Sequence, residues 1–253
     1  MGSLTDGRAL VTAGGQGIGK AICQELLRHG ADLAVHYYTS RDGAEEVVRL
    51  AQKAGRRAAS FQADLTHEDE TRRVVSECVG FLGGLDILIN NAGTLVERRP
   101  LERIDCAYWN RVMDVNLTSM VLVTRECMPH LLAAGRSSIV NLSSLAGRNG
   151  GGGGALAYAA AKGAVMTWTR GLATEYGPKG VRVNAVAPGM TLGSRFHEVY
   201  TPPEVQRRHI ASLPVGRAGT TDDIARAVVF LAAEYDGFVH GATLDVNGGA
   251  HYS

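Results

Sequence analysis

The stretch Ala9-Leu10-Val11-Thr12-Ala13-Gly14-Gly15-Gln16-Gly17-Ile18-Gly19 decides the interpretation of the fold. An apolar run leads into a turn with four glycines within residues 14–19, and a helical pattern follows directly. Glycines at a strand-to-helix junction let the backbone approach a pyrophosphate, whose charge is stabilised at the helix N-terminus. The spacing differs from a strict GxGxxG, so a glycine-rich turn without a ligand is the competing interpretation.

Outward from this turn, short apolar runs alternate with longer segments of helical periodicity. The expected strands are 8–12, 33–37, 58–62, 87–90, 138–142, 182–186 and 243–246. The expected helices are 17–29, 44–53, 68–81, 108–133, 159–176 and 221–233. Repeated strand–helix–strand units require parallel strands with helices on both faces, and right-handed crossovers make the sheet doubly wound. The predicted fold class is therefore α/β, with one Rossmann-type domain over residues 1–253.

The segment 190–213 interrupts this alternation. It contains Pro202-Pro203 and several Arg and His residues, yet no linker or change of composition separates it from the rest. We interpret it as an insertion over one end of the sheet, a substrate lid within the single domain.

Composition excludes several classes of protein. The 253 residues are 45% hydrophobic and 20% charged, which allows a sizeable core and argues against disorder, collagen and coiled coil. Lys plus Arg number 26 and Asp plus Glu 25, so no general attraction to nucleic acid or membrane surfaces is expected. The four cysteines show neither disulfide nor zinc spacing, and no metal site is expected. Without a secretory pattern or a long apolar run, the expected location is the cytoplasm.

The residues after the second expected strand bear on the kind of dinucleotide. An NAD-binding fold usually has Asp or Glu there, which binds the ribose 2′-hydroxyl. Here Tyr38, Thr39, Ser40 and Arg41 follow the strand, with no acid. Hydroxyls and an arginine suit a 2′-phosphate, so NADP(H) is favoured and NAD(H) remains possible. The alternative is that Arg41 simply begins the next helix.

A tyrosine and a lysine, Tyr158 and Lys162, lie four residues apart and therefore on one face of an expected helix. Such a pair is common by chance on protein surfaces. Polar or glycine-containing segments accompany it at the expected strand ends, where open α/β sheets build their sites: Asn90-Asn91-Ala92-Gly93, Ser143-Ser144 and Ala187-Pro188-Gly189. Asn116, on the long expected helix, would face the same site.

With these segments in this order, the sequence resembles the short-chain dehydrogenase/reductase family over essentially the whole chain. It is similar to that family's 3-oxoacyl-[acyl-carrier-protein] reductases and its sugar or sugar-acid dehydrogenases. The resemblance implies seven strands, a homotetramer or homodimer, and reversible NAD(P)H-dependent reduction of a carbonyl to a secondary alcohol. It implies a catalytic tetrad of Asn116, Ser144, Tyr158 and Lys162. The expected coenzyme-binding residues are Gly14, Gly15, Gln16, Gly17, Ile18, Gly19, Tyr38, Thr39, Ser40, Arg41, Asp64, Leu65, Asn91, Ala92, Gly93, Tyr158, Lys162, Pro188, Gly189 and Thr191.

The side chains of the tetrad suit carbonyl reduction, which needs a hydride and a proton. Tyr158 can donate the proton, and a neighbouring Lys162 ammonium is expected to lower the phenol pKa from its usual value near 10. Ser144 would donate a hydrogen bond to the carbonyl oxygen. By resemblance, Asn116 holds a water that relays protons to the lysine; the alternative is a polar residue inside a helix.

The sequence departs from the family pattern in several places. Ala13 occupies the position of the first glycine of the turn, which leaves the local turn geometry open. Gln16 replaces a basic residue that is frequent in NADP-preferring members, which weakens the preference for NADP(H). Five consecutive glycines, 150–154, lie between Ser144 and Tyr158, and this segment is one residue longer than usual. Ser143 is therefore an alternative to Ser144.

Basic residues gather near the expected pocket mouth. They are Arg98, Arg99, Arg148, Arg195, His197, Arg207, Arg208 and His209. In a nearly neutral protein they favour an anionic small-molecule substrate, with Arg148, Arg195 and His197 as candidate binding residues. A solvated lid is the alternative. A keto acid, a keto sugar or sugar acid, and a 3-oxoacyl thioester all fit, and a non-catalytic dinucleotide-sensing or structural subunit is the competing function.

Overall fold

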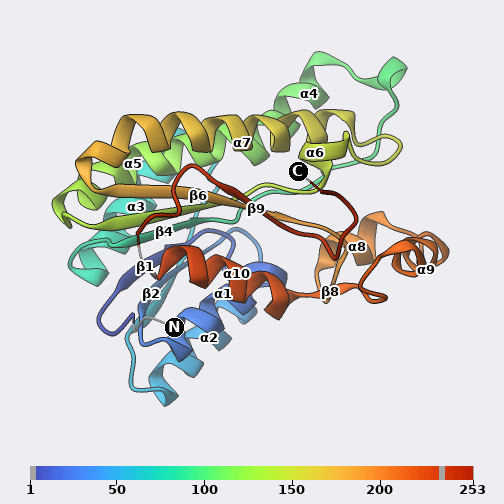
Figure 1. Ribbon diagram of the computed structural model, residues 1–253. Coiled ribbons are helices and arrows are strands. Elements are labelled where there is room, and N and C mark those ends of the chain that lie inside the picture. Colours follow the sequence, from blue (N-terminus) through green and yellow to red (C-terminus); the bar gives the residue numbers. More distant parts are fainter. Residues whose placement is uncertain (1–3, 234–236, 253) are drawn as a thin grey trace.

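A seven-stranded parallel sheet forms the centre of the protein (Figure 1). The computed structural model describes residues 4–233 and 237–252. The strand order is β3-β2-β1-β4-β5-β6-β9, a doubly wound arrangement with its reversal between β1 and β4. The strands are β1 (Arg8–Val11), β2 (Asp32–Tyr37), β3 (Ala58–Gln62), β4 (Ile87–Asn90), β5 (Ser137–Leu142), β6 (Val181–Pro188) and β9 (Thr243–Val246). The expected seven strands and the α/β class are confirmed.

Helices cover both faces of the sheet. One face carries α1 (Gly17–Arg28), α2 (Arg41–Lys53) and α10 (Thr221–Ala232). The other carries α3 (Glu68–Leu82), α5 (Ser119–Ala133) and α7 (Leu156–Tyr176). Shorter helices are α4 (Cys106–Met113), α6 (Ala146–Asn149) and the 3-10 turns Leu101–Arg103 and Gly177–Lys179.

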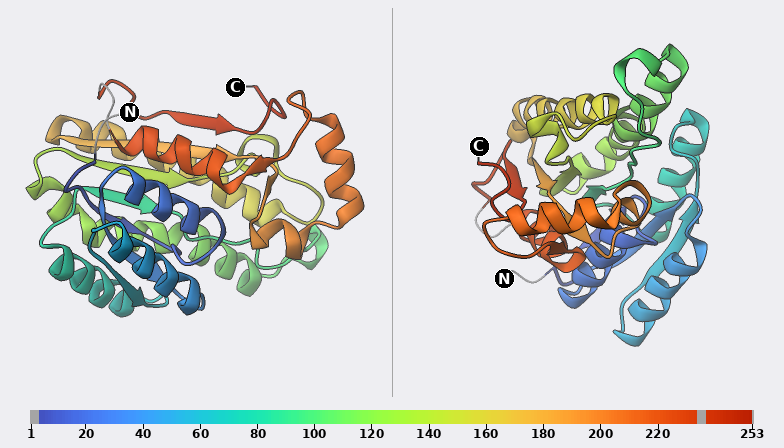
Figure 2. Two further views of the ribbon diagram at one scale, coloured as in Figure 1. Left: turned by 90° about the horizontal axis from the view of Figure 1, so that it is seen from below. Right: turned by 90° about the vertical axis from the view of Figure 1, so that its right-hand side faces the viewer.

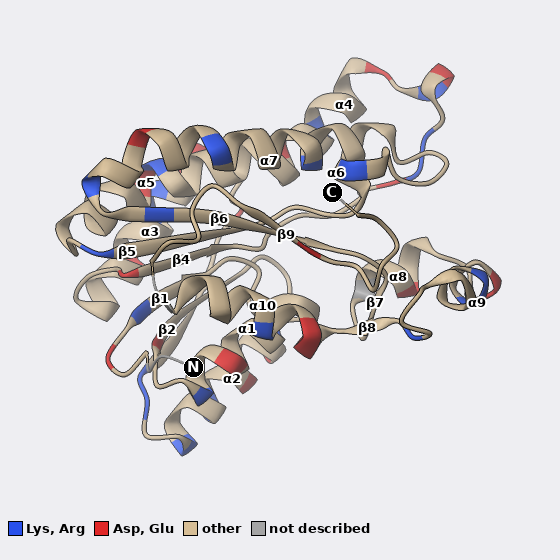
Figure 3. Ribbon diagram, viewed as in Figure 1, with Lys and Arg blue, Asp and Glu red and all other residues tan. Residues whose placement is uncertain are grey.

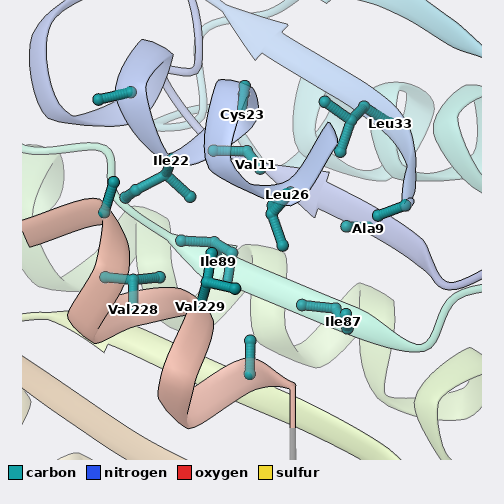
Figure 4. Packing of buried hydrophobic residues seen from close by; sticks show 14 of the residues in the cluster. Ala9, Val11, Ile22, Cys23, Leu26, Leu33, Ile87, Ile89, Val228 and Val229 are labelled. Atoms are coloured by element: carbon teal, nitrogen blue, oxygen red, sulfur yellow. The ribbon is translucent and has the colours of Figure 1, made fainter. Parts of the chain in front are cut away.

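Successive side chains along a strand point to opposite faces of the sheet and pack into a hydrophobic core on each face. On β1, Val11 packs against α1 and α10, whereas Leu10 points to the opposite layer. Figure 4 shows Val11 with Ile22 and Leu26 of α1 and Val228 of α10. Full burial of each large aliphatic side chain contributes about 1.5–3 kcal/mol. This packing fixes the carboxyl ends of β1 and β4, where the glycine turn and the segment 91–93 begin.

Two expected helices differ from the structure at their bounds. The helix expected at 44–53 already begins at Arg41, which is therefore the first residue of α2. The helix expected at 108–133 begins at Cys106 and contains a π-helical segment, Asp114–Thr118, between α4 and α5. Such segments often lie at functional sites, and this one contains Asn116.

The segment that interrupts the alternation lies at one end of the sheet (Figure 2). It forms β7 (Thr191–Leu192), α8 (Arg195–Tyr200) and α9 (Pro203–Ser212), and β7 pairs with β8 (Gly219–Thr220). Charged residues of both signs are spread over the surface helices, including α9 (Figure 3). In the described part of the chain, no helix is long and apolar enough to cross a membrane.

Candidate active site

The glycine turn after β1 is packed so closely that side chains are excluded. A Cβ on Gly19 would lie 2.2 Å from the Ala13 carbonyl oxygen, and one on Gly15 would lie 2.5 Å from the Ser40 carbonyl oxygen. Ala13 itself has φ +50°, the left-handed conformation that glycine adopts more readily. The turn geometry is therefore kept despite the alanine, at a cost in backbone strain.

A buried histidine supports this turn. The Ala13 N–H donates a hydrogen bond to His36 Nδ1 at 3.1 Å, and His36 Nε2 lies 3.1 Å from the Ala63 carbonyl oxygen. Burial lowers the pKa of His36 to about 4, so the ring is neutral at physiological pH. His36 thus joins the turn to the end of β3, beside Asp64.

Two cavities border the glycine turn. The first, about 640 Å³, is lined by Gln16, Tyr38, Thr39, Ser40, Asp64, Leu65, Ala92 and Gly93, among others. The second, about 360 Å³, is lined by Ile18, Ser144, Tyr158, Pro188, Gly189 and Thr191, among others. Most of the expected coenzyme-binding residues therefore line one or the other of these cavities, on either side of the turn. The backbone cradle, with no room for a Cβ, fits a dinucleotide pyrophosphate at the N-terminus of α1.

The remaining expected coenzyme residues do not line either cavity. Gly14 packs against Cys23 and Val35, and Asn91 donates to the carbonyl oxygens of Thr12 and Ala13 at 3.0 and 3.2 Å. Through these two hydrogen bonds, Asn91 stabilises the conformation of the turn. Gly17 has φ +50° and lies next to the base of the lid, where a Cβ would be 3.5 Å from Ser194.

The tyrosine and lysine of α7 are both buried, and Tyr158 lines the second cavity. Tyr158 is 8% exposed, and Lys162 Nζ lies 5.8 Å from the centroid of its ring. Lys162 Nζ donates to the Leu142 carbonyl oxygen at 2.8 Å. Helical spacing thus brings the two side chains to one point, as the sequence predicts.

Of the two adjacent serines, Ser144 faces the tyrosine. Ser144 and Tyr158 line the same cavity, and the Ser144 hydroxyl partly offsets the rise in the Tyr158 pKa; the Ser144 Oγ accepts from the Ala146 N–H at 3.1 Å. Ser143 instead donates to the Lys162 carbonyl oxygen at 2.7 Å and is buried. The geometry therefore favours Ser144 for contact with substrate and gives Ser143 a structural position.

Asn116 is fully buried and tied to the segment after β4. Its Nδ2 donates to the carbonyl oxygens of Thr94 and Val112 at 2.7 and 2.9 Å, and its Oδ1 accepts from the Thr94 N–H at 3.0 Å. A Cβ on Gly93 would lie 2.7 Å from Asn116 Oδ1 and 2.9 Å from Lys162 Nζ. Two of the expected tetrad residues, Asn116 and Lys162, thus converge at Gly93, and the Asn116 side chain already forms hydrogen bonds with the backbone.

Burial controls the protonation of the tyrosine. It raises the pKa of Tyr158 to about 12, with a partial lowering by the hydrogen bond from Ser144, and it lowers the pKa of Lys162 to about 8. The expectation that Lys162 lowers the phenol pKa is not met in this structure, because Nζ bonds the Leu142 carbonyl and desolvation of the phenol dominates. Tyr158 is therefore held as the proton-carrying phenol.

The arginine after β2 does not line either cavity. Arg41 Nε donates to the Tyr37 hydroxyl at 3.1 Å and lies 3.7 Å from a Glu45 carboxylate oxygen, with its side chain 68% exposed. Its position as the first residue of α2 turns it toward these partners. Tyr38, Thr39 and Ser40 do line the first cavity, where no acid follows β2.

Lid residues cover the tyrosine. The Phe196 ring lies 5.5 Å from Tyr158 and 5.4 Å from Tyr200. The Tyr200 hydroxyl donates to the Val96 carbonyl oxygen at 3.2 Å. Val96 has φ +67°, a strained conformation for a β-branched residue, and such strain concentrates at functional sites.

The three candidate substrate-binding residues differ in whether they line the second cavity. His197 lines the second cavity. Arg148 does not, because its guanidinium pairs with Asp245 of β9 at 3.1 Å and donates to the Thr243 carbonyl oxygen. Arg195 begins α8, and its side chain lies outside the described part of the structure. Arg98 and His209 also line the cavity, and both were among the basic residues noted from the sequence.

Comparison with known proteins agrees with this site. A family model described as Enoyl-(Acyl carrier protein) reductase matches residues 12–251. Cis-4-hydroxycyclohexanecarboxylate dehydrogenase of Sinomonas cyclohexanicum is 37% identical over 241 residues, 95% of each chain. A 3-oxoacyl-[acyl-carrier-protein] reductase of Staphylococcus aureus is 34% identical, covering 96% of this chain and 97% of the relative. The chain belongs to the short-chain dehydrogenase/reductase family. It is an oxidoreductase of that family, which disfavours the non-catalytic alternative.

Solved short-chain dehydrogenase/reductase structures superpose over nearly the whole chain. A short chain dehydrogenase from Burkholderia cenocepacia in complex with NADP has a TM-score of 0.90 at 33% identity, covering 98% of each chain. An NADH-dependent reductase responsible for alginate metabolism has a TM-score of 0.90 at 36% identity, covering 99% of each chain. Similar structures therefore occur with both coenzymes.

Sequence reasoning missed two residues that shape this short-chain dehydrogenase/reductase site. His36 gave no signal beyond its place in a buried strand. Gly43 lies in the first turn of α2, where a Cβ would be 1.9 Å from the Gly15 carbonyl oxygen. A glycine so close to an expected helix is the one sequence feature that could have pointed to Gly43.

Proposed function

We propose that the protein interconverts a carbonyl group and a secondary alcohol on a small substrate, with NADP(H) as coenzyme. The observation that carries this is that Ser144 and Tyr158 line one cavity beside the glycine turn, while the other cavity lies on the opposite side of that turn. The coenzyme, when bound, supplies or accepts the hydride. We also propose that residues 1–253 act as one catalytic domain with 190–213 as its lid.

The residues of the chain divide the remaining work. Ser144 holds the substrate oxygen and stabilises the charge that develops on it. Tyr158, a phenol at neutral pH, donates its proton to that oxygen during reduction. Lys162, buried beside it, offsets part of the cost that burial imposes on the transient phenolate, and Asn116 fixes the segment 93–94, which lines the first cavity.

The coenzyme would lie along both cavities. The N–H groups of the glycine turn and the N-terminus of α1 would hold its pyrophosphate, and Asp64 and Leu65 its adenosine end. Tyr38, Thr39 and Ser40 offer hydroxyls and no negative charge to a 2′-phosphate. Arg41 would have to leave Tyr37 and Glu45 to join them, which its exposure permits.

Coenzyme preference is tested by steady-state kinetics with NADPH and NADH. We expect a higher kcat/KM for NADPH in the wild type. Thr39→Asp places a carboxylate just after β2. It is expected to lower kcat/KM for NADPH at least tenfold and to leave kcat/KM for NADH nearly unchanged. A tenfold preference of the wild type for NADH would reject NADP(H) and leave the reaction class intact.

The reaction is tested by absorbance at 340 nm with ketoacyl thioesters, keto acids, keto sugars and simple ketones. Tyr158→Phe is expected to lower turnover of the best substrate by about 10²–10⁴-fold. Tyr176→Phe, on the same helix but away from both cavities, is the matched control. Wild-type turnover in Tyr158→Phe would reject the mechanism.

Assembly and location are further proposals. We infer a cytoplasmic homotetramer, supported by the edge strand β9, which exposes Leu244 at one side of the sheet. Light scattering coupled to gel filtration measures the mass, and a monomer at micromolar concentration would reject the proposed assembly.

A further inference from the structure

The cavity that contains Tyr158 carries basic side chains and no acidic ones. Arg98, His197 and His209 line it, and among the residues that the structure describes, no Asp or Glu does. Burial, followed by the positive charges of His209 and Arg98, lowers the pKa of His197 to about 4. The electrostatic environment therefore favours a negatively charged ligand group.

The guanidinium of Arg98 is held in place but not neutralised. Its Nε donates to the Tyr200 carbonyl oxygen at 3.0 Å, and its Nη1 donates to the Gly153 carbonyl oxygen at 2.8 Å. Within residues 4–233 and 237–252, no carboxylate forms an ion pair with it. A guanidinium has five N–H donors. These two bonds leave both Nη2 donors available, and a planar guanidinium suits a carboxylate.

Neighbouring arginines differ in this respect. Arg99 pairs with Glu97 at 3.1 Å and with Asp105 at 3.4 Å, and it stacks on the Tyr108 ring. Arg148 pairs with Asp245. Their charges are balanced inside the protein, whereas the Arg98 charge borders the cavity.

The cavity that Arg98 and Tyr158 share is small, about 360 Å³. Its lining includes the apolar side chains of Leu95, Ala155 and Phe196. Arg98 is exposed, whereas Tyr158 is 8% exposed. A compact substrate would thus carry its reacting carbon inside and its charge toward the opening, with an apolar body between them.

We propose that Arg98 binds the carboxylate of a small keto or hydroxy acid whose carbonyl or carbinol carbon lies at Tyr158, with an apolar spacer between the two groups. This inference rests on the proposed function, because it places the reaction at Tyr158 in the same cavity. Arg98 is then a specificity-determining residue. Since it already holds Tyr200 of the lid and Gly153 of the glycine run, carboxylate binding also joins both segments at the cavity opening.

The test compares 4-oxocyclohexanecarboxylate with its uncharged methyl ester as substrates, followed by NADPH oxidation at 340 nm. Arg98→Gln is expected to lower kcat/KM for the acid by about 10- to 100-fold, mainly through KM, and to change the ester less than about threefold. Arg98→Lys is expected to recover part of the loss. Arg207→Gln is the matched control, because it removes the same charge from an exposed position on α9 that does not line the cavity.

A binding measurement needs no turnover. Isothermal titration of cyclohexanecarboxylate and cyclohexanecarboxamide into the enzyme with NADP⁺ is expected to show carboxylate binding that Arg98→Gln weakens about tenfold or more. Circular dichroism and thermal unfolding verify that the variants fold.

The possible outcomes separate the two proposals. Equal losses for acid and ester in Arg98→Gln would mean that Arg98 only holds the lid, and would overturn the inference. Equal use of acid and ester by the wild type would also overturn it, while the proposed function stands. Arg98-dependent binding of the carboxylate without reduction of any carbonyl compound would reject the proposed function and support the carboxylate site.

Discussion

The backbone N–H of Ala13 donates its hydrogen bond to a side chain, Nδ1 of His36, at 3.1 Å. The other ring nitrogen lies 3.1 Å from the Ala63 carbonyl oxygen, so the ring must carry its proton on Nε2. Two backbone segments that line the first cavity are thereby joined through one neutral imidazole. His36 is a positioning residue for the coenzyme site.

Replacement of His36 tests this role. His36→Leu leaves the Ala13 N–H unsatisfied, which costs about 1–3 kcal/mol, and is expected to raise the coenzyme Kd roughly tenfold. His36→Asn is the matched variant, since an amide can both accept and donate, and is expected to keep most of the affinity. Kd is measured by NADPH fluorescence titration. Equal affinities for the Leu and Asn variants would contradict the prediction.

Stability is expected to fall in mild acid. Burial lowers the pKa values of His36 and His197 to about 4, below the ordinary value near 6.5. The unfolded chain then binds protons between pH 6.5 and 4 that the folded protein excludes, so the stability present above pH 6.5 is lost as the pH falls toward 4. Each group contributes roughly 1 kcal/mol per pH unit in this range.

Urea unfolding at several pH values measures this effect. His36→Asn removes one of the two groups and is expected to reduce the slope of unfolding free energy against pH. An unchanged slope would show that other groups control the acid response.

Removal of the buried ammonium is expected to stabilise the protein while abolishing activity. Burial lowers the pKa of Lys162 from 10.5 to about 8, which corresponds to about 3 kcal/mol of unfavourable burial at neutral pH. Lys162→Met removes this cost but also loses the hydrogen bond to the Leu142 carbonyl, worth about 1 kcal/mol. A net gain of about 2 kcal/mol is expected in urea unfolding at pH 7. A less stable variant would contradict this account.

The same glycine-to-alanine change is expected to have opposite effects in two helices. In Gly43→Ala, the new Cβ would meet the Gly15 carbonyl oxygen at 1.9 Å, so the coenzyme turn must shift. We expect a loss of about 1–3 kcal/mol in stability and at least a tenfold higher coenzyme KM. In Gly80→Ala, on α3, nothing lies within 4 Å, and a gain of about 0.5–1 kcal/mol is expected. Similar coenzyme KM values for the two variants would contradict the argument.

The sequence predicts most of the fold because its signals are local. Apolar runs mark the strands, and the turn at 14–19 marks the first crossover. The positions of Tyr158 and Ser144 also follow from local pattern, since one lies at helical spacing from Lys162 and the other at a strand end. These side chains meet because the carboxyl ends of parallel strands share one edge.

Other properties depend on contacts that sequence spacing does not reveal. The sequence suggests Arg148 as a substrate-binding residue. In the structure it pairs instead with Asp245, which lies 97 residues further along the chain. The sequence does not reveal that Arg41 donates a hydrogen bond to the Tyr37 hydroxyl. The raised pKa of Tyr158 arises from the depth of burial, which no local pattern specifies.

The ion pair between Arg148 and Asp245 has a consequence for biosynthesis. Arg148 belongs to α6, directly after Ser144, whereas Asp245 lies in β9, 97 residues further along the chain. While the polypeptide emerges from the ribosome, α6 is made long before its carboxylate partner exists. The contact between α6 and β9 therefore forms only after β9 has been translated and has docked beside β6, near the end of synthesis.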